Sequence, residues 1–192
     1  NIVCGYGNEI GEALTNNKDV GIISWTGSVQ SGEKVMAAAA KNITKVSLEL
    51  GGKAPELVCK DADLDLAVNA IVASRIIYSG QVCNCAERVY VVEEVYDEFI
   101  AKLVTAMKEV KVGSACDDDE IDMSAQINKT QLDKIEKMVE KAVADGANVL
   151  VGGKRHAEFS KGHYYEPTVI VDVDQDFEIM QKETFGPVLP VM

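Results

Sequence analysis

Basic side chains are scarce in this sequence of 192 residues, which has 19 lysines and arginines against 31 aspartates and glutamates and a formal net charge of -12. Nucleic acids and anionic membrane surfaces both attract proteins mainly through basic side chains. The deficit therefore argues against either kind of partner. A solvated acidic surface explains the excess of carboxylates without any special function.

Long apolar runs are missing as well. A membrane-spanning helix needs about 20 consecutive apolar residues, and no run in the sequence approaches that length. The first residues, NIVCGYG, lack the basic segment and apolar core of a secretory signal peptide. These absences favour a cytoplasmic location, and an apolar share of 47% is sufficient for a substantial core.

Residues that bind metals or form disulfides are also few. The sequence has two histidines and five cysteines, an odd number scattered along the chain. A structural zinc site needs about four converging Cys or His ligands, and the pair Cys83 and Cys85 supplies two. Cysteines one residue apart also bridge poorly without local distortion. We therefore expect neither a metal site nor a permanent disulfide.

Short apolar runs alternate with helical patterns. Strands are expected at NIVC and over residues 20–27, 45–50, 88–94 and 148–153. Helices are expected over 10–16, 28–41, 63–80, 95–110 and 129–146, with Ser28 and Asp63 as N-caps and Gly146 as the C-cap. Leu66 and Ile71 are expected on the buried face of the helix over 63–80. The alternation is typical of an α/β protein with a parallel sheet.

Two segments could carry chemistry. Cys83 follows Gly80 and Gln81 at the end of a predicted helix, where glycine permits a sharp turn that presents a side chain. An exposed thiolate would be a nucleophile, whereas a buried thiol would be only a small apolar residue. Glu49 ends an apolar strand before paired glycines, a position that suits a general base. Each signal is weak by itself.

Four motifs occur in one order: TGSVQSG, LELGGK, GQVCNCAER and ETFGPV. Their order and spacing resemble those of the NAD(P)-dependent aldehyde dehydrogenase superfamily over the whole chain. The segments GGKAP, DADLDLAV and SGQVCNCAERVYV most resemble the branch that oxidises lactaldehyde and glycolaldehyde. The resemblance implies an α/β fold of three αβα layers with a mostly parallel sheet. It also implies that residues 1–50 are the C-terminal part of a nucleotide-binding domain and 51–192 the major part of the catalytic domain.

The resemblance assigns roles to individual residues. Cys83 corresponds to the nucleophile that forms a thiohemiacetal and then a thioester, and Glu49 to the base that activates water. The cofactor would be NAD or NADP, with NAD favoured. The corresponding cofactor-binding residues are Gly27, Ser28, Gly32, Glu183 and Phe185. Lys53 is expected to be structural, and the turn GYGNEIG departs from the common dinucleotide-binding spacing because Gly11 comes one residue late.

The implied reaction is oxidation of a small aldehyde, with 2-hydroxy aldehydes as candidates, in a homo-oligomer that is a dimer or a tetramer. A CoA-acylating enzyme is an alternative, although such relatives commonly lack the glutamate base. A thiol redox module of Cys83 and Cys85 is another. The strand-like start and the apolar end, FGPVLPVM, suggest a piece of a longer protein. An inactive folded fragment is therefore the last alternative.

Overall fold

The computed structural model describes residues 1–192, which divide into two compact units, Asn1–Gly51 and Gly52–Met192. Each unit has its own strands and helices. The assignment of the two units to a nucleotide-binding and a catalytic domain stays a prediction. None of the helices combines the length and the apolar character that crossing a membrane requires.

The first unit contains a β-α-β arrangement. β1 (Ile22–Thr26) and β2 (Lys45–Glu49) pair in parallel, and α2 (Val29–Ala40) connects them. Ser28 caps α2 as predicted, because its Oγ accepts a 3.2 Å hydrogen bond from the Ser31 N–H. A short π-helical turn, η1 (Gly7–Gly11), and α1 (Glu12–Thr15) precede β1.

The prediction of a strand at NIVC is wrong. Residues 1–4 form an exposed loop. The sheet of the first unit consists of β1 and β2, and residues 1–4 pair with neither strand. Strand propensity alone does not make a segment join a sheet.

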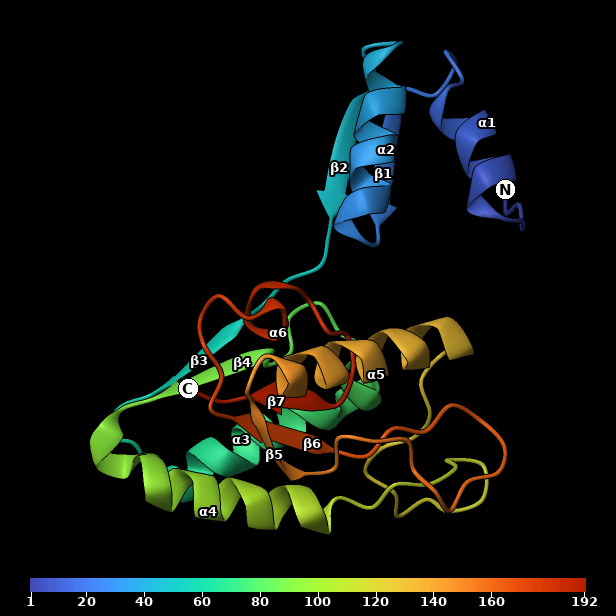
Figure 1. Ribbon diagram of the computed structural model, residues 1–192. Coiled ribbons are helices and arrows are strands. Elements are labelled where there is room, and N and C mark those ends of the chain that lie inside the picture. Colours follow the sequence, from blue (N-terminus) through green and yellow to red (C-terminus); the bar gives the residue numbers. More distant parts are fainter. The chain divides into compact units, whose positions relative to one another are not determined.

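The second unit is built on a mixed sheet (Figure 1). β3 (Pro55–Val58) pairs in parallel with β4 (Arg88–Val91). β6 (Thr168–Val171) pairs in parallel with β7 (Val188–Pro190) and antiparallel with β5 (Asn148–Val151). A parallel bridge between Val89 and Val191 joins the two groups in the order β3-β4-β7-β6-β5. β3, β6 and β7 are not among the predicted strands; every residue of β6 and β7 is buried, so neither shows the alternation of a half-buried strand.

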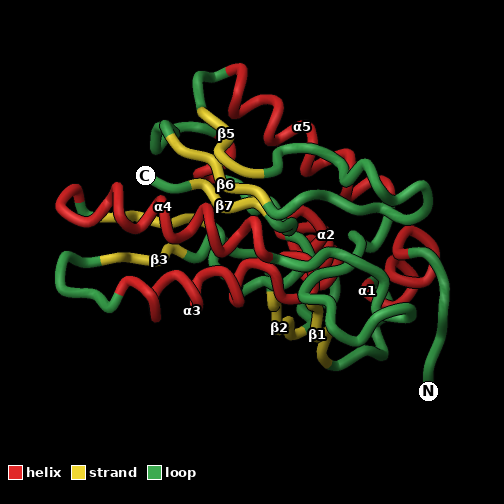
Figure 2. Tube along the Cα trace, turned by 90° about the horizontal axis from the view of Figure 1, so that it is seen from below, coloured by secondary structure: helices red, strands yellow, loops and turns green.

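Helices cover both faces of this sheet, which confirms the predicted three αβα layers. α3 (Leu64–Ile76) and α4 (Glu93–Glu109) lie side by side on one face (Figure 2), and α5 (Lys129–Ala144) and α6 (Glu178–Gln181) lie on the other. Alternate residues of β6 enter different cores: Val169 and Val171 pack with α3 and α4, whereas Ile170 packs with α5 and α6. The two cores therefore share the sheet between them.

The predicted helices are present, but α3 differs in two ways. Asp63 caps it as predicted, and Ile71 is buried, but Leu66 is 67% exposed. Apolar residues occur all round α3, so periodicity alone does not select the buried face. The helix also stops at Ile76 and does not continue to residue 80, because Tyr78 and Ser79 have left-handed backbone conformations.

A matched pair of substitutions on α5 tests the second core. Val139 is buried and Val143, one turn later, is 49% exposed. Val139→Ala should lower the free energy of unfolding by about 2 kcal/mol, since two buried methyl groups are lost. Val143→Ala has the same effect on helix propensity and should change the free energy of unfolding by less than about 0.5 kcal/mol. Guanidinium denaturation followed by circular dichroism measures both; equal losses would contradict the packing described for α5.

Candidate active site

In the first unit, the proposed base lies beside the start of α2. The Gly27 N–H donates a 3.0 Å hydrogen bond to the Glu49 carbonyl, so the ends of β1 and β2 share one edge. The Glu49 side chain is exposed there. No acidic residue occupies the first turn of α2. The N–H groups and the dipole at this helix end therefore suit an anion such as a pyrophosphate.

Both glycines of the TGSVQSG motif permit close packing within the first unit. A Cβ on Gly27 would lie 2.8 Å from the Trp25 ring, and a Cβ on Gly32 would lie 2.6 Å from Leu50 Cδ2. Packing alone therefore accounts for both glycines. Their contact with a cofactor, like that of Ser28, stays a prediction.

In the second unit, Cys83 follows a sharp turn. The short helix η2 (Ile77–Gly80) contains Tyr78, Ser79 and Gly80, which have φ angles of 46°, 60° and 75°. The Cys83 side chain is exposed beyond this turn. The sequence correctly places a turn here, but it does not reveal that two residues besides glycine are left-handed.

Gly52 brings three sequence motifs together. Its N–H donates a 3.1 Å hydrogen bond to Glu183 Oε1, and a Cβ at this position would lie 2.9 Å from the Cys83 carbonyl oxygen. Only glycine permits both approaches without a shift of the backbone. The predicted nucleophile and the predicted ribose-binding carboxylate therefore lie next to the same residue.

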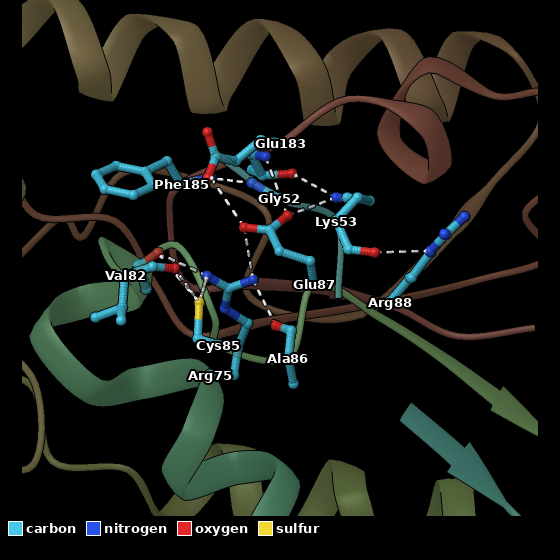
Figure 3. Close-up of polar contacts among 12 residues, drawn as sticks. Gly52, Lys53, Arg75, Val82, Cys85, Ala86, Glu87, Arg88, Glu183 and Phe185 are labelled. Carbon is cyan, nitrogen blue, oxygen red and sulfur yellow. Dashed lines mark hydrogen bonds and ion pairs between the residues drawn. The ribbon is translucent and has the colours of Figure 1, made fainter. Parts of the chain in front are cut away.

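A buried carboxylate links the loops around this position (Figure 3). Glu87 is fully buried, and its two oxygens face four donors. Lys53 Nζ lies 2.6 Å from Oε2 and Arg75 Nη1 lies 3.0 Å from Oε1. The Thr184 N–H donates to Oε2 and the Phe185 N–H donates to Oε1, each at 3.1 Å. The expectation that Lys53 is structural agrees with this geometry.

The charges of the network decide the protonation of Glu87. Burial alone would raise the pKa of Glu87, but Arg75, Lys53 and the Thr184 N–H outweigh burial and hold the pKa below its usual range. Burial lowers the pKa of Lys53, and the pairing with Glu87 opposes this shift only in part. The four donors around one carboxylate support an ionised Glu87.

Arg75 fixes the segment that carries the cysteines. Its Nη2 donates to the Gly80 carbonyl at 2.7 Å and to Cys85 Sγ at 2.9 Å, and its Nη1 donates to the Ala86 carbonyl at 2.6 Å. These contacts hold both ends of the turn that presents Cys83.

Cys85 differs from Cys83 in its surroundings. It is 2% exposed, and its Sγ donates a 2.9 Å hydrogen bond to the Val82 carbonyl. Burial raises the pKa of Cys85, although Arg75 opposes the shift. A buried, protonated thiol is poorly suited to reversible exchange with an exposed neighbour. The geometry therefore favours a packing role for Cys85 over the redox alternative.

Phe185 has a left-handed backbone conformation with a φ of 55°. Its N–H donates to Glu87, and its carbonyl accepts a 2.7 Å hydrogen bond from Gln131 Nε2, which also donates to the Thr184 carbonyl at 3.0 Å. Gln131 and Glu87 therefore hold the ETF segment from two sides.

The sequence prediction missed Glu87, Arg75 and Gln131. The available signal was a charged residue inside an apolar pattern: Arg75 interrupts ASRII, and Glu87 precedes the strand RVYV. Such residues are rarely buried without a partner. Gln131 gave no signal, because a glutamine near the start of an exposed helix is ordinary.

The effect of Glu87 can be measured with a matched control. Glu87→Gln leaves two buried cations without their carboxylate and should lower the free energy of unfolding by about 3 to 5 kcal/mol. Glu136→Gln breaks an ion pair with Arg155 in which both side chains are partly exposed, and it should cost less than about 1 kcal/mol. Equal costs in denaturation experiments would contradict the described network.

The ionised Glu87 also makes the stability of the protein depend on pH. Because the pKa of Glu87 is lower in the folded protein, its contribution is fully present above the unfolded value of about 4.3 and is lost as the pH falls toward the folded value. Wild-type stability should therefore decline below about pH 4 more steeply than that of Glu87→Gln. Parallel pH profiles would contradict an ionised Glu87.

The whole chain resembles known enzymes. A model described as the aldehyde dehydrogenase family matches residues 1–192. Lactaldehyde dehydrogenase of Escherichia coli (strain K12) is 55% identical over 100% of this chain and 40% of its own length. D-glyceraldehyde dehydrogenase (NADP(+)) of Picrophilus torridus is 41% identical over 98% of this chain and 38% of its own. The chain thus spans about two fifths of the length of these curated relatives.

Solved structures of aldehyde dehydrogenases also resemble this chain. The crystal structure of the Escherichia coli lactaldehyde dehydrogenase matches with a TM-score of 0.96 and 54% identity, over 99% of this chain and 39% of that chain. Betaine aldehyde dehydrogenase from Staphylococcus aureus, solved with NAD+, matches with a TM-score of 0.96 and 36% identity, over 99% of this chain and 38% of that chain. The resemblance inferred from the four motifs is confirmed, and the chain belongs to the aldehyde dehydrogenase family.

Proposed function

We propose that the protein containing this chain oxidises a small aldehyde to its carboxylic acid, with NAD or NADP as the hydride acceptor. The observation that carries the proposal is the exposed Cys83, held on a rigid turn beside Gly52 and Glu183. Residues 1–50 then contribute to the nucleotide-binding domain, and residues 51–192 form most of the catalytic domain. A dimer or a tetramer is the expected assembly.

Cys83 acts as the nucleophile in this proposal. Its Sγ attacks the aldehyde carbon to give a thiohemiacetal, and loss of hydride leaves a thioester. Glu49 accepts a proton from water, which attacks the thioester carbon and releases the acid and the thiol. A soft sulfur nucleophile forms the adduct readily, and the carboxylate supplies the proton transfer that water needs.

The residues present suit a dinucleotide. The first turn of α2 has no acidic side chain, so its helix dipole favours a pyrophosphate near Ser28, and the Glu183 carboxylate can accept hydrogen bonds from ribose hydroxyls. Phe185 supplies an apolar ring next to Glu183. The bound cofactor would supply the hydride acceptor. NAD is tested first, as the family resemblance suggests, and NADP is tested alongside it, because relatives are named or solved with either cofactor.

The names of two relatives support a proposed substrate class. Lactaldehyde and glyceraldehyde, in the names of two of them, are both small 2-hydroxy aldehydes. We therefore expect 2-hydroxy aldehydes to be better substrates than unsubstituted aldehydes of equal length. Glycolaldehyde and acetaldehyde form a matched pair for this comparison, because they differ by one hydroxyl.

Removal of the nucleophile is the direct test of the proposal. In the full-length protein, Cys83→Ala should lower kcat for NADH formation by about a thousandfold or more, as loss of a nucleophile does in other covalent enzymes. Cys116→Ala removes another exposed thiol and should leave kcat within about twofold. Dehydrogenase activity retained by Cys83→Ala would refute the mechanism.

The base can be tested separately from the nucleophile. Glu49→Gln should still form the thioester, so rapid mixing should give a burst of about one NADH per active site followed by slow turnover. Mass spectrometry should show the acyl group on Cys83.

Product analysis of the unmodified protein with CoA present separates the acylating alternative: acyl-CoA as the main product would remove Glu49 from its role.

A further inference from the structure

The turn before Cys83 needs external support. Tyr78, Ser79 and Gly80 are consecutive left-handed residues, and glycine alone adopts this conformation readily. Strain of this kind persists only where surrounding groups enforce it. Arg75 supplies one such contact, through its hydrogen bond to the Gly80 carbonyl.

A segment 45 to 47 residues later in the chain supplies the others. Ser79 Oγ donates a 2.7 Å hydrogen bond to the Ser124 carbonyl, and Gln126 Nε2 donates a 3.0 Å hydrogen bond to the Ser79 carbonyl. Gln81 Oε1 accepts a 2.9 Å hydrogen bond from the Ile127 N–H. Residues 124–127 therefore contact the turn on both sides of Gly80.

Gln126 is the buried member of this contact. It is 4% exposed, and the Ser79 that it contacts is 2% exposed. Its own backbone is held in place because its N–H donates a 2.9 Å hydrogen bond to the His163 carbonyl. A buried hydrogen bond between fixed partners restrains the Ser79 peptide much more than a solvated one would.

We propose that Gln126 is a positioning residue for the nucleophile: it holds the left-handed turn at Ser79 and so fixes the direction in which Cys83 projects. Gln126 touches no reacting atom. It acts by raising the fraction of molecules in which the turn is correctly formed, and the rate is proportional to that fraction. The proposal rests on the proposed role of Cys83.

Gln126→Met tests this contact with little other change. Met is similar in length and volume to Gln, and Gln126 Oε1 has no hydrogen-bond partner, so the substitution removes one hydrogen bond from the turn. In the full-length enzyme, kcat should fall by up to about tenfold, because loss of one buried hydrogen bond lowers the equilibrium constant for forming the turn by about that factor. KM for the aldehyde and for NAD should stay within about twofold.

A second substitution distinguishes positioning from general damage. Tyr78 is 77% exposed and left-handed. Tyr78→Gly makes the left-handed conformation easy to adopt even without the Gln126 hydrogen bond. Tyr78→Ala removes the same ring but keeps the energetic cost of a left-handed residue that is not glycine. Tyr78→Gly combined with Gln126→Met should recover most of the lost kcat. Tyr78→Ala combined with Gln126→Met should not.

Hydrogen exchange gives a readout that does not depend on the reaction. Gln126→Met should speed amide exchange in a peptide covering residues 77–83, and Tyr78→Gly should reduce the difference. If Gln126→Met does not fold, Gln81→Met removes the neighbouring hydrogen bond between the turn and residues 124–127, the one that Gln81 accepts from the Ile127 N–H. Unchanged amide exchange in Gln126→Met, or equal recovery of kcat by Tyr78→Gly and Tyr78→Ala, would overturn the proposed role of Gln126. Activity in Cys83→Ala would instead overturn the proposed function, and the exchange result would still stand.

Discussion

The buried carboxylate of Glu87 is the constraint on which the second unit depends. A charge without solvent must have partners, and here Lys53, Arg75 and two backbone N–H groups supply them. These partners come from three distant parts of the chain. The GGK segment, the end of α3 and the ETF loop therefore cannot move independently, and the cysteine turn lies among them.

The strained residues near the site lie in the connecting segments, whereas the sheet and its helices supply a rigid frame. Tyr78, Ser79 and Phe185 are left-handed, and all three lie in the loops near Cys83 and Glu183. The sheet and its helices on both faces are regular by comparison. Packed layers supply a fixed frame, and hydrogen bonds from Arg75, Gln126 and Gln131 transfer that rigidity to the loops. Precise placement of a nucleophile needs hydrogen bonds of this kind, which hold the loop that carries it.

Local signals predicted the local structure well. Ser28 and Asp63 cap their helices because a short oxygen-bearing side chain satisfies an N–H of the first turn, which is a matter of neighbouring residues. The failures concern partners outside the local segment. NIVC has the composition of a strand but pairs with none, and Leu66 lies on the wrong side of α3 because apolar residues surround that helix.

The sequence by itself determined the α/β class, most helices and the four motifs with Cys83 and Glu49 as candidates, because each depends on residues close together in the chain. Tertiary structure alone decided that Glu87 is a buried carboxylate, that Cys85 packs inside while Cys83 is exposed, and that Gln126 contacts Ser79. The physical reason is range: caps and periods act over a few residues, whereas burial and charge pairing depend on segments that only folding brings together.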